Sequence, residues 1–283
     1  MQTVTRIHAL RDCIRQWRRQ GGRIALVPTM GNLHAGHLQL VRHARSIADR
    51  VVVSLFINPM QFDVQQDLAD YPVTQEQDMA ALMDADTDLL FMPGVDEIYP
   101  AGVDAATQVI VPGLNTLLEG ACRPTHFDGV STVVSKLFNM VQPDIAVFGE
   151  KDYQQLLLVR RMVADLNMPL AIEAVATVRD ADGLALSSRN GHLSREERAL
   201  APQLYQTLLD VAELLHQGER ELAAIEQAAM AQLSEAGLEP QYVSIRNSAD
   251  LTVPGAHDQE LVVLAAALLG TTHLLDNVRV SIT

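Results

Sequence analysis

The chain has 283 residues, of which 48% are hydrophobic, so it can bury the core of one large domain or of two smaller ones. Its 35 acidic and 21 basic residues give a formal net charge of -14, which disfavours nucleic acid and anionic membranes as partners. No stretch has the ~18 uncharged apolar residues that span a bilayer, and residues 1–20 lack the apolar run of a signal peptide. Cys13 and Cys122 have neither metal-ligand nor C-x-x-C spacing, which predicts reduced thiols in a cytoplasmic protein.

The first predicted β/α unit begins with "RIALVPTM" (23–30), an apolar run of strand length. Gly31 and Gly36 follow it. Apolar residues then recur at steps of three, as on one face of a helix: Leu38, Val41, Ala44 and Ile47. This pattern predicts a strand, a loop and a helix, with His34 and His37 at the joint.

Strand and helix patterns continue to alternate. The predicted strands are 51–58, 87–93 and 144–150, and the predicted helices are 74–85, 129–141 and 152–166. Thr74 stands three residues before Gln77, which is the spacing of a capping box. Strands rich in Val, Ile and Leu between helices predict an α/β fold with a parallel sheet covered on both faces. Ligands bind beyond the carboxyl ends of such strands, so residues 34–37, 58–61 and 149–152 are expected at one rim.

The pattern changes after "DGLALSSRNGHLS" (182–194). Two amphipathic helices are predicted next, at 195–217 and 220–236, followed by strands at 240–247 and 260–270. Ser194 and Glu197 again have capping-box spacing. We therefore expect a first domain over residues 1–186 and a smaller α+β domain over residues 187–283.

Three interpretations of His34 and His37 are open. Histidines at this spacing can be ordinary core or surface side chains. A zinc site needs further ligands, and no nearby Cys, Asp or Glu stands at a usual spacing. An anion site is the third, because backbone N–H groups and the helix dipole attract phosphate to the first turn of a helix. Gly36 would let the backbone approach a nucleotide without an intervening Cβ. The pattern favours an anionic ligand.

Five motifs carry a resemblance to a known family. They are "VPTMGNLHAGH" (27–37), "FINPMQF" (56–62), "CRPTHFDGVSTVVSKLFN" (122–139), "GEKDYQQ" (149–155) and "LALSSRN" (184–190). In this order and spacing they resemble the pantothenate synthetase (pantoate-β-alanine ligase) family of the H-x-G-H nucleotidyltransferase superfamily, over essentially the whole chain. The resemblance implies a Rossmann-like domain with a smaller C-terminal domain, in a cytoplasmic homodimer.

The same resemblance implies an activity in pantothenate and coenzyme A biosynthesis. Members condense (R)-pantoate with β-alanine through a pantoyl adenylate, using ATP with Mg²⁺ and releasing AMP and pyrophosphate. The partners expected for this chain are therefore these small molecules, with no nucleic acid and no membrane.

The resemblance also implies which residues act on ATP. His34 and His37 donate hydrogen bonds to charge that develops on the phosphates, with His37 as the proton donor, and Lys151 holds the β- and γ-phosphates. These three are the expected catalytic residues. Asp152 is expected at the ribose or the Mg²⁺ of ATP. The full ATP-binding set implied is Met30, Gly31, Asn32, Leu33, His34, Ala35, Gly36, His37, Gly149, Glu150, Lys151, Asp152, Val178, Leu186, Ser187, Ser188 and Arg189.

The acid and amine substrates are assigned to other residues in the same way. Gln61 and Gln155 match the family's pantoate-binding glutamines, and an unpaired buried amide costs about 1–3 kcal/mol, which makes them specificity devices. Asn58 is expected near the phosphate or β-alanine, and Arg123 near the phosphates. Asp128 stands where relatives have basic or small residues, so the charge of its loop is left open.

Two other functions remain as alternatives. Another H-x-G-H enzyme could transfer AMP or CMP to a phosphate and stop there, but it would need cationic residues where this chain has Gln61 and Gln155. A nucleotide-binding regulatory protein would show no turnover. Consumption of ATP with pantoate, with a phosphate ester or with no acceptor distinguishes the three.

Overall fold

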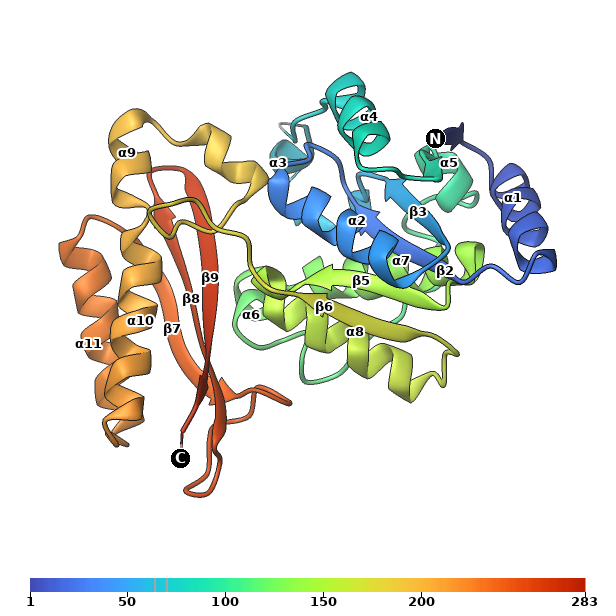
Figure 1. Cartoon of the computed structure of the whole chain (residues 1–283). Helices are drawn as coiled ribbons and strands as arrows, with labels where there is room; N and C mark the ends of the chain where they lie inside the picture. Colours follow the sequence, from blue (N-terminus) through green and yellow to red (C-terminus); the bar gives the residue numbers. More distant parts are fainter. Residues whose placement is uncertain (64, 70, 283) are drawn as a thin grey trace. The chain divides into compact units, whose positions relative to one another are not determined.

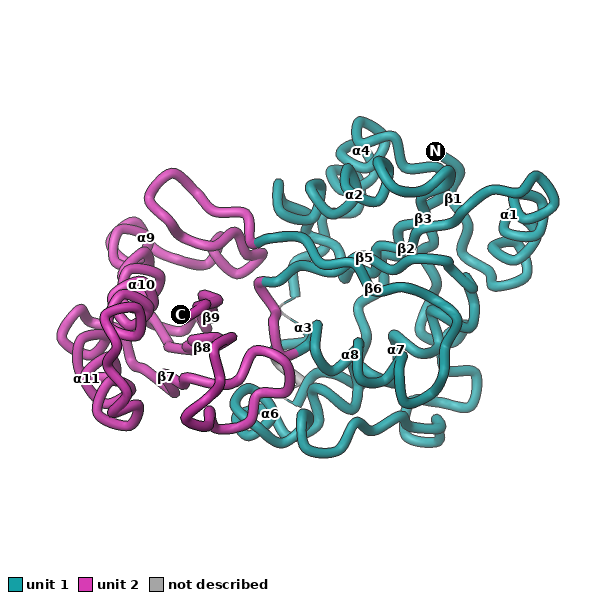
Figure 2. The backbone as a smooth tube through the Cα atoms, turned by 60° about the horizontal axis from the view of Figure 1, so that its bottom comes forward, with its two compact units in different colours: residues 1–150, 155–176 teal, residues 151–154, 177–283 magenta. Residues whose placement is uncertain are grey.

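The computed structural model describes residues 1–63, 65–69 and 71–282, and this part of the chain divides into two compact units (Figure 2). The first unit contains residues 1–150 and 155–176. The second contains residues 151–154 and the chain from residue 177 onward.

Residues 177–186, assigned from the sequence to the first domain, pack with the second unit. The reason is local pairing: Leu186 N donates to the Val178 carbonyl at 2.9 Å, and Arg179 pairs with Asp276. A functional domain boundary after residue 186 stays a prediction.

Within the described residues of the first unit, six parallel strands form one sheet in the order β1-β4-β3-β2-β5-β6 (Figure 1). The strands are β1 (Gln2–Val4), β2 (Ile24–Thr29), β3 (Arg50–Leu55), β4 (Leu89–Phe91), β5 (Ile145–Gly149) and β6 (Ala171–Val175). From β2 the chain runs outward to β3 and β4, and it later returns to the other side of β2 as β5 and β6. The strand order therefore reverses between β2 and β5, and ligands of such sheets bind at this switch point.

Along the chain, the helices of the first unit alternate with these strands. They are α1 (Ile7–Arg19), α2 (Ala35–Ile47), α3 (Gln65–Ala69), α4 (Gln75–Asp84), α5 (Val95–Ile98), α6 (Glu119–Cys122), α7 (His126–Val141) and α8 (Tyr153–Asp165), with the short 3-10 helices η1 (Pro59–Gln61) and η2 (Glu150–Asp152). Helix α2 packs on β2, β3 and β5, and it buries Val41 and Ala44 in a core shared with Val27 and Val53. Burying a valine side chain such as that of Val41 contributes about 1.5–3 kcal/mol, so this core holds α2 against β2.

The described residues of the second unit form an antiparallel sheet in the order β7-β8-β9. Its elements are η3 (Ser188–His192), α9 (Arg195–Leu200), α10 (Gln203–His216), α11 (Leu222–Glu235), β7 (Glu239–Asn247), β8 (Glu260–Leu269) and β9 (Thr272–Ser281). Helix α10 packs on β8 and β9, and α11 packs on β7, around a core that includes Leu208, Leu233 and Val263. The capping box at Ser194 and Glu197 is confirmed, with Glu197 N donating to Ser194 Oγ at 3.1 Å.

The expected fold class is confirmed, two local predictions are wrong, and three strands are new. Thr74 makes no capping bond; its hydroxyl donates instead to Asp78 at 3.2 Å. The helix predicted over 195–217 is two helices, because a turn at Ala201 and Pro202 separates α9 from α10. Strands β1, β6 and β9 were not predicted. β6 has exposed and half-buried residues, and β9 carries Asp276 and Asn277, so neither shows the apolar run of a buried strand.

Candidate active site

The histidine pair lies at the start of α2, directly after β2. His34 is the N-cap residue, and its Nδ1 accepts a hydrogen bond from the Gly36 amide at 3.1 Å. His37 Nδ1 accepts one from the His34 amide at 3.4 Å, and the two ring centroids are 4.0 Å apart. Because both Nδ1 atoms accept, we assign the proton of each neutral ring to Nε2. In each ring the hydrogen-bond donor is therefore Nε2–H.

A buried carboxylate holds the loop before the histidines. Asp78 on α4 is 3% exposed and accepts hydrogen bonds from the amides of Asn32 (2.9 Å) and Leu33 (2.8 Å). Gly31 and Asn32 adopt positive φ angles of 92° and 51°, and a Cβ on Gly31 would meet Asp78 Oδ2 at 3.1 Å. From the sequence, backbone N–H groups at the start of α2 were expected to attract an anion. In the structure the amides of Asn32, Leu33 and Gly36 donate to protein acceptors.

Asn58 and Gln61 lie together after β3. Asn58 is 1% exposed, and its Nδ2 donates to Gln61 Oε1 and to the Gly129 carbonyl, both at 3.1 Å. Its Oδ1 accepts from the Tyr99 hydroxyl at 2.7 Å. Gln61 Nε2 contacts Met30 Sδ at 3.0 Å. Asn58 therefore orients the Gln61 side chain. The Gln61 amide in turn contacts Met30, the residue directly after β2.

Burial keeps this cluster neutral. Tyr99 is 2% exposed, and burial raises its pKa to about 12. The side chains of Asn58, Gln61 and Tyr99 are thus an uncharged hydrogen-bonded cluster, which suits the hydroxyl and carbonyl groups of a small acid.

Gly129 permits the close approach of α7 to η1. A Cβ at this position would lie 2.5 Å from the Met60 carbonyl oxygen and 2.6 Å from Gln61 N. Since real Cβ atoms do not approach backbone atoms this closely, any larger residue must push the Asn58–Gln61 turn away from α7.

Arg123 lies beside the same turn. Its Nη2 donates to the Gln61 carbonyl at 3.4 Å, and its Nε is 3.9 Å from Asp63 Oδ2. His126 Nδ1 also lies 3.0 Å from the Gln61 carbonyl. Asp128, whose effect the sequence left open, accepts from Asn115 Nδ2 at 2.9 Å. Arg123 therefore lies at the Gln61 turn, and Asp128 binds a neutral amide.

The remaining first-unit residues follow β5. Gly149 is the last residue of β5, Glu150 begins η2, and Gln155 lies in α8; all three are half-buried. Gly149 ends β5, and the histidine pair follows β2. These are the two strands on either side of the switch point.

The other predicted ATP residues belong to the second unit. Lys151 is 16% exposed in its side chain and lies 3.8 Å from Asp152, which is 50% exposed. Residues 178–186 form a turn closed by the bond between Leu186 and Val178, and it leads into Ser187. Ser187 caps η3 by accepting from Arg189 N at 3.3 Å, and Ser188 is the first residue of that helix.

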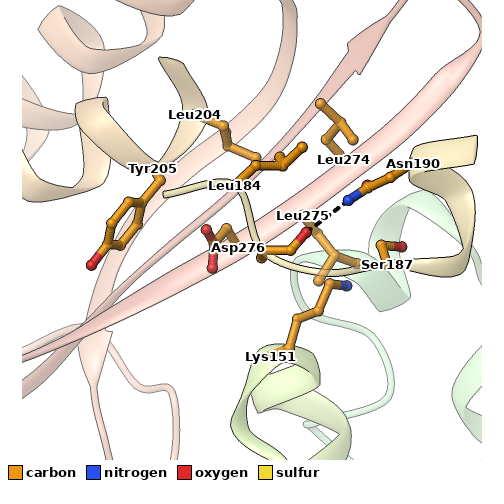
Figure 3. Close-up of a pocket in the computed structure, with 10 residues that line it drawn as sticks. Lys151, Leu184, Ser187, Asn190, Leu204, Tyr205, Leu274, Leu275 and Asp276 are labelled. Atoms are coloured by element: carbon orange, nitrogen blue, oxygen red, sulfur yellow. Dashed lines mark hydrogen bonds between the residues drawn. The ribbon is translucent and has the colours of Figure 1, made fainter. Parts of the chain in front are cut away.

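Lys151 and Ser187 line one cavity within this unit (Figure 3). Its walls also include Leu184, Tyr205 and Asp276. The dashed bond in Figure 3 joins Asn190 Nδ2 to the Ala185 carbonyl at 3.0 Å and holds the start of η3 against the wall. The structure thus brings together an ammonium group and a hydroxyl group that are 36 positions apart in sequence (187 − 151).

Sequence reasoning missed several supporting residues. Gly129 gave a usable signal, since an isolated glycine in an apolar helical pattern often marks close packing. Asp78 and Tyr99 gave none, because their partners in the loops at 32–33 and 58 are distant in sequence.

No helix in the described residues is long and apolar enough to cross a membrane. In the same part of the chain no three His, Cys, Asp or Glu side chains gather as a metal site. The side chain of Asp152 is 50% exposed and is a carboxylate, the kind of ligand that Mg²⁺ prefers.

These features define a class: a doubly wound α/β protein with polar side chains at the carboxyl ends of its strands, as in nucleotide-binding enzymes. The family model for pantoate-beta-alanine ligase matches residues 2–279. The pantothenate synthetase of Thioalkalivibrio sulfidiphilus is 57% identical over 282 residues, covering 100% of this chain and 99% of the relative.

Solved structures agree with this match. The pantothenate synthetase of Thermus thermophilus has a TM-score of 0.91 and 45% identity, covering 98% of this chain and 99% of that one. The pantoate-beta-alanine ligase of Francisella tularensis, complexed with beta-gamma ATP and beta-alanine, has a TM-score of 0.83 and 31% identity, covering 98% and 97%. The chain belongs to the pantoate-β-alanine ligase family.

Proposed function

We propose that this protein condenses (R)-pantoate with β-alanine to form pantothenate, consuming ATP. A pantoate carboxylate oxygen attacks the α-phosphorus of ATP and pyrophosphate leaves, which gives pantoyl adenylate. The β-alanine amine then attacks the acyl carbon and loses a proton as AMP leaves. A carboxylate needs this activation because its own charge makes it a poor electrophile. Membership of the family over residues 2–279 is the observation that carries the proposal.

His34 and His37 act on the phosphates in this scheme. Their Nδ1 atoms accept backbone hydrogen bonds, so Nε2–H is the donor that each ring directs to a ligand. Negative charge builds on the phosphate oxygens as pyrophosphate leaves, and a donor placed there is typically worth about 3 to 4 kcal/mol. His37 is assigned the proton transfer. The main-chain bonds to both rings support these roles, because they hold the imidazoles in one orientation.

Lys151 is assigned to the β- and γ-phosphates, with Ser187, Ser188 and Arg189 as further contacts from the η3 turn. The shared cavity of Lys151 and Ser187 supports this grouping. Mg²⁺ bound to the phosphates would neutralise charge on them, and Asp152 is the carboxylate that could contact it. The other assigned ATP contacts are Met30, Gly31, Asn32, Leu33, Ala35, Gly36, Gly149, Glu150, Val178 and Leu186.

Pantoate is assigned to Gln61 and Gln155, and β-alanine or the phosphates to Asn58 and Arg123. The structure supports an indirect role for Asn58, since its Oδ1 accepts from Tyr99 and its Nδ2 donates to Gln61 Oε1 and to the Gly129 carbonyl. Asn58 then acts by fixing Gln61. A cytoplasmic homodimer remains part of the proposal on family grounds.

A product assay tests the function directly. ATP, Mg²⁺, pantoate and β-alanine should yield AMP and pantothenate in equal amounts. Labelled pyrophosphate should exchange into ATP with pantoate and without β-alanine, because the adenylate forms first. Exchange that strictly required β-alanine would rule out a separate adenylate. Activity with a phosphate ester in place of pantoate would favour a simple nucleotidyltransferase, and no turnover with any acceptor would favour a regulatory protein.

Gln61→Ala and Gln155→Ala separate the substrate subsites. Each should weaken pantoate binding far more than ATP binding. A variant that lost ATP binding and kept pantoate binding would show that the subsites are exchanged.

A further inference from the structure

Lys151 follows β5 of the first unit along the chain, yet residues 151–154 pack with the second unit, as the magenta segment in Figure 2 shows. Two hydrogen bonds explain this. Asn277 Nδ2 on β9 donates to the Lys151 carbonyl at 2.9 Å, and the Tyr153 hydroxyl donates to the Ser248 carbonyl at 2.8 Å. Asn277 and Tyr153 are 6% and 5% exposed, so both bonds are shielded from water. The backbone of Lys151 is therefore fixed by β9.

A buried ion pair next to Asn277 reaches the segment that leads to Ser187. Arg179 binds the Asp276 carboxylate through both terminal nitrogens and donates to the carbonyls of Asn277 (3.3 Å) and Gly183 (3.2 Å). Its guanidinium lies 3.5 Å from the centroid of the Tyr205 ring. Asp276 is 3% exposed in its side chain. Two adjacent β9 residues thus hold both segments that supply polar groups to the cavity.

We propose that Asn277 is a positioning residue for Lys151. This inference rests on the proposed function only in that Lys151 contacts the ATP phosphates. A lysine side chain has many rotamers, so its ammonium group is placed well only if its main chain is fixed. A displacement of about 1 Å at a reacting group can cost up to a hundredfold in rate. Because the bond goes to the lysine backbone, the proposal requires the effect of Asn277 on exchange to pass through Lys151.

A double-mutant cycle tests this dependence. Pantoate-dependent exchange of pyrophosphate into ATP is measured for the wild type, Asn277→Ala, Lys151→Ala and the double variant. Asn277→Ala should slow exchange about tenfold in the wild-type background and less than twofold when Lys151 is already alanine. An equal loss in both backgrounds would overturn the proposal. If exchange by Lys151→Ala is too slow to measure, ATP dissociation constants of the same four proteins by calorimetry replace the rates in the cycle.

Further variants separate positioning from folding. Asn277→Asp keeps the shape but has no donor for the Lys151 carbonyl, so it should lose at least as much exchange as Asn277→Ala; wild-type exchange would contradict the role of the bond. Tyr153→Phe removes only a hydroxyl and should cause about a threefold loss that disappears in the Lys151→Ala background. It serves as the test if Asn277→Ala does not fold.

Glu226→Ala is the matched control. Its side chain accepts a hydrogen bond from the Ile245 amide at 2.7 Å in the same unit and does not line the cavity. It should lower stability and leave exchange within twofold of wild type. Absence of pantoate-dependent exchange in the wild type would contradict the proposed function itself, and the cycle of ATP dissociation constants would still test the link between Asn277 and Lys151.

Discussion

The two units hold their candidate site residues by different physical means. In the first unit, Asn58, Gln61 and Tyr99 form a network of uncharged hydrogen bonds. In the second unit, Arg179 and Asp276 form a buried ion pair beside Lys151. A neutral hydrogen bond contributes about 0.5–1.5 kcal/mol, whereas removing one partner of a buried ion pair costs about 3–5 kcal/mol. Breaking the Asn58, Gln61 and Tyr99 network should therefore cost less stability than breaking the pair of Arg179 and Asp276.

Asp276→Ala should have the largest effect on stability. It leaves the Arg179 guanidinium largely buried without its carboxylate, so the free energy of unfolding should fall by about 3–5 kcal/mol in a denaturant titration. Asp182→Ala is the matched control in the same unit, because its pair with Arg198 is 44% and 34% exposed and should contribute at most about 1 kcal/mol. An equal fall in the free energy of unfolding for Asp276→Ala and Asp182→Ala would show that the pair of Arg179 and Asp276 stabilises the fold no more than an exposed pair.

His37→Ala should leave the fold intact and slow pyrophosphate exchange by two or more decades. ATP affinity should stay within a few fold, since the hydrogen bond strengthens as charge develops. His43→Ala on the same helix is the control and should exchange at the wild-type rate. Wild-type turnover by His37→Ala would assign His37 to packing.

The sequence supported those parts of the site whose residues are close together along the chain. The strand, the glycine and the two histidines at 24–37 were predicted together because they follow one another in one short segment of the chain. The alternation of strands and helices implied a ligand rim at the carboxyl ends of the strands, but the strand order that makes the switch point is not encoded in that alternation.

The supporting contacts could not be predicted in the same way. Asn277 reaches Lys151 across 126 positions and Asp78 reaches Asn32 across 46, and no periodicity encodes such pairs. Nothing in the sequence showed that a carboxylate on α4 would bind the loop amides at 32–33.

Gly129→Ala should affect pantoate selectively. The added Cβ would lie 2.5 Å from the Met60 carbonyl oxygen, so the turn that carries Gln61 must move. We expect the KM for pantoate to rise about five- to tenfold, with the KM for ATP within twofold, in steady-state assays. Gly94→Ala is the control, because no atom lies within 4 Å of its added Cβ and its backbone φ is −75°. A parallel rise in both KM values would place the turn at the ATP subsite.

Alkaline unfolding gives the smallest expected effect and tests whether the first-unit network is neutral. Burial raises the pKa of Tyr99 to about 12, above the value near 10 of an unfolded tyrosine. The folded protein therefore keeps a proton that the unfolded chain releases, so this contribution to stability is present below pH 10 and is lost as the pH rises from 10 to 12. By pH 11 the loss should be about 1 kcal/mol.

Tyr99→Phe should lack this part of the pH dependence and, at pH 9, be less stable by about 1 kcal/mol because the bond to Asn58 is gone. Denaturant titrations of both proteins at pH 9, 10 and 11 measure the difference, in which the titration of the other tyrosines cancels. Curves that stay parallel up to pH 11 would show that Tyr99 ionises in the folded protein as readily as in the unfolded chain, and the description of the Asn58 network as a neutral, water-shielded site would then be wrong.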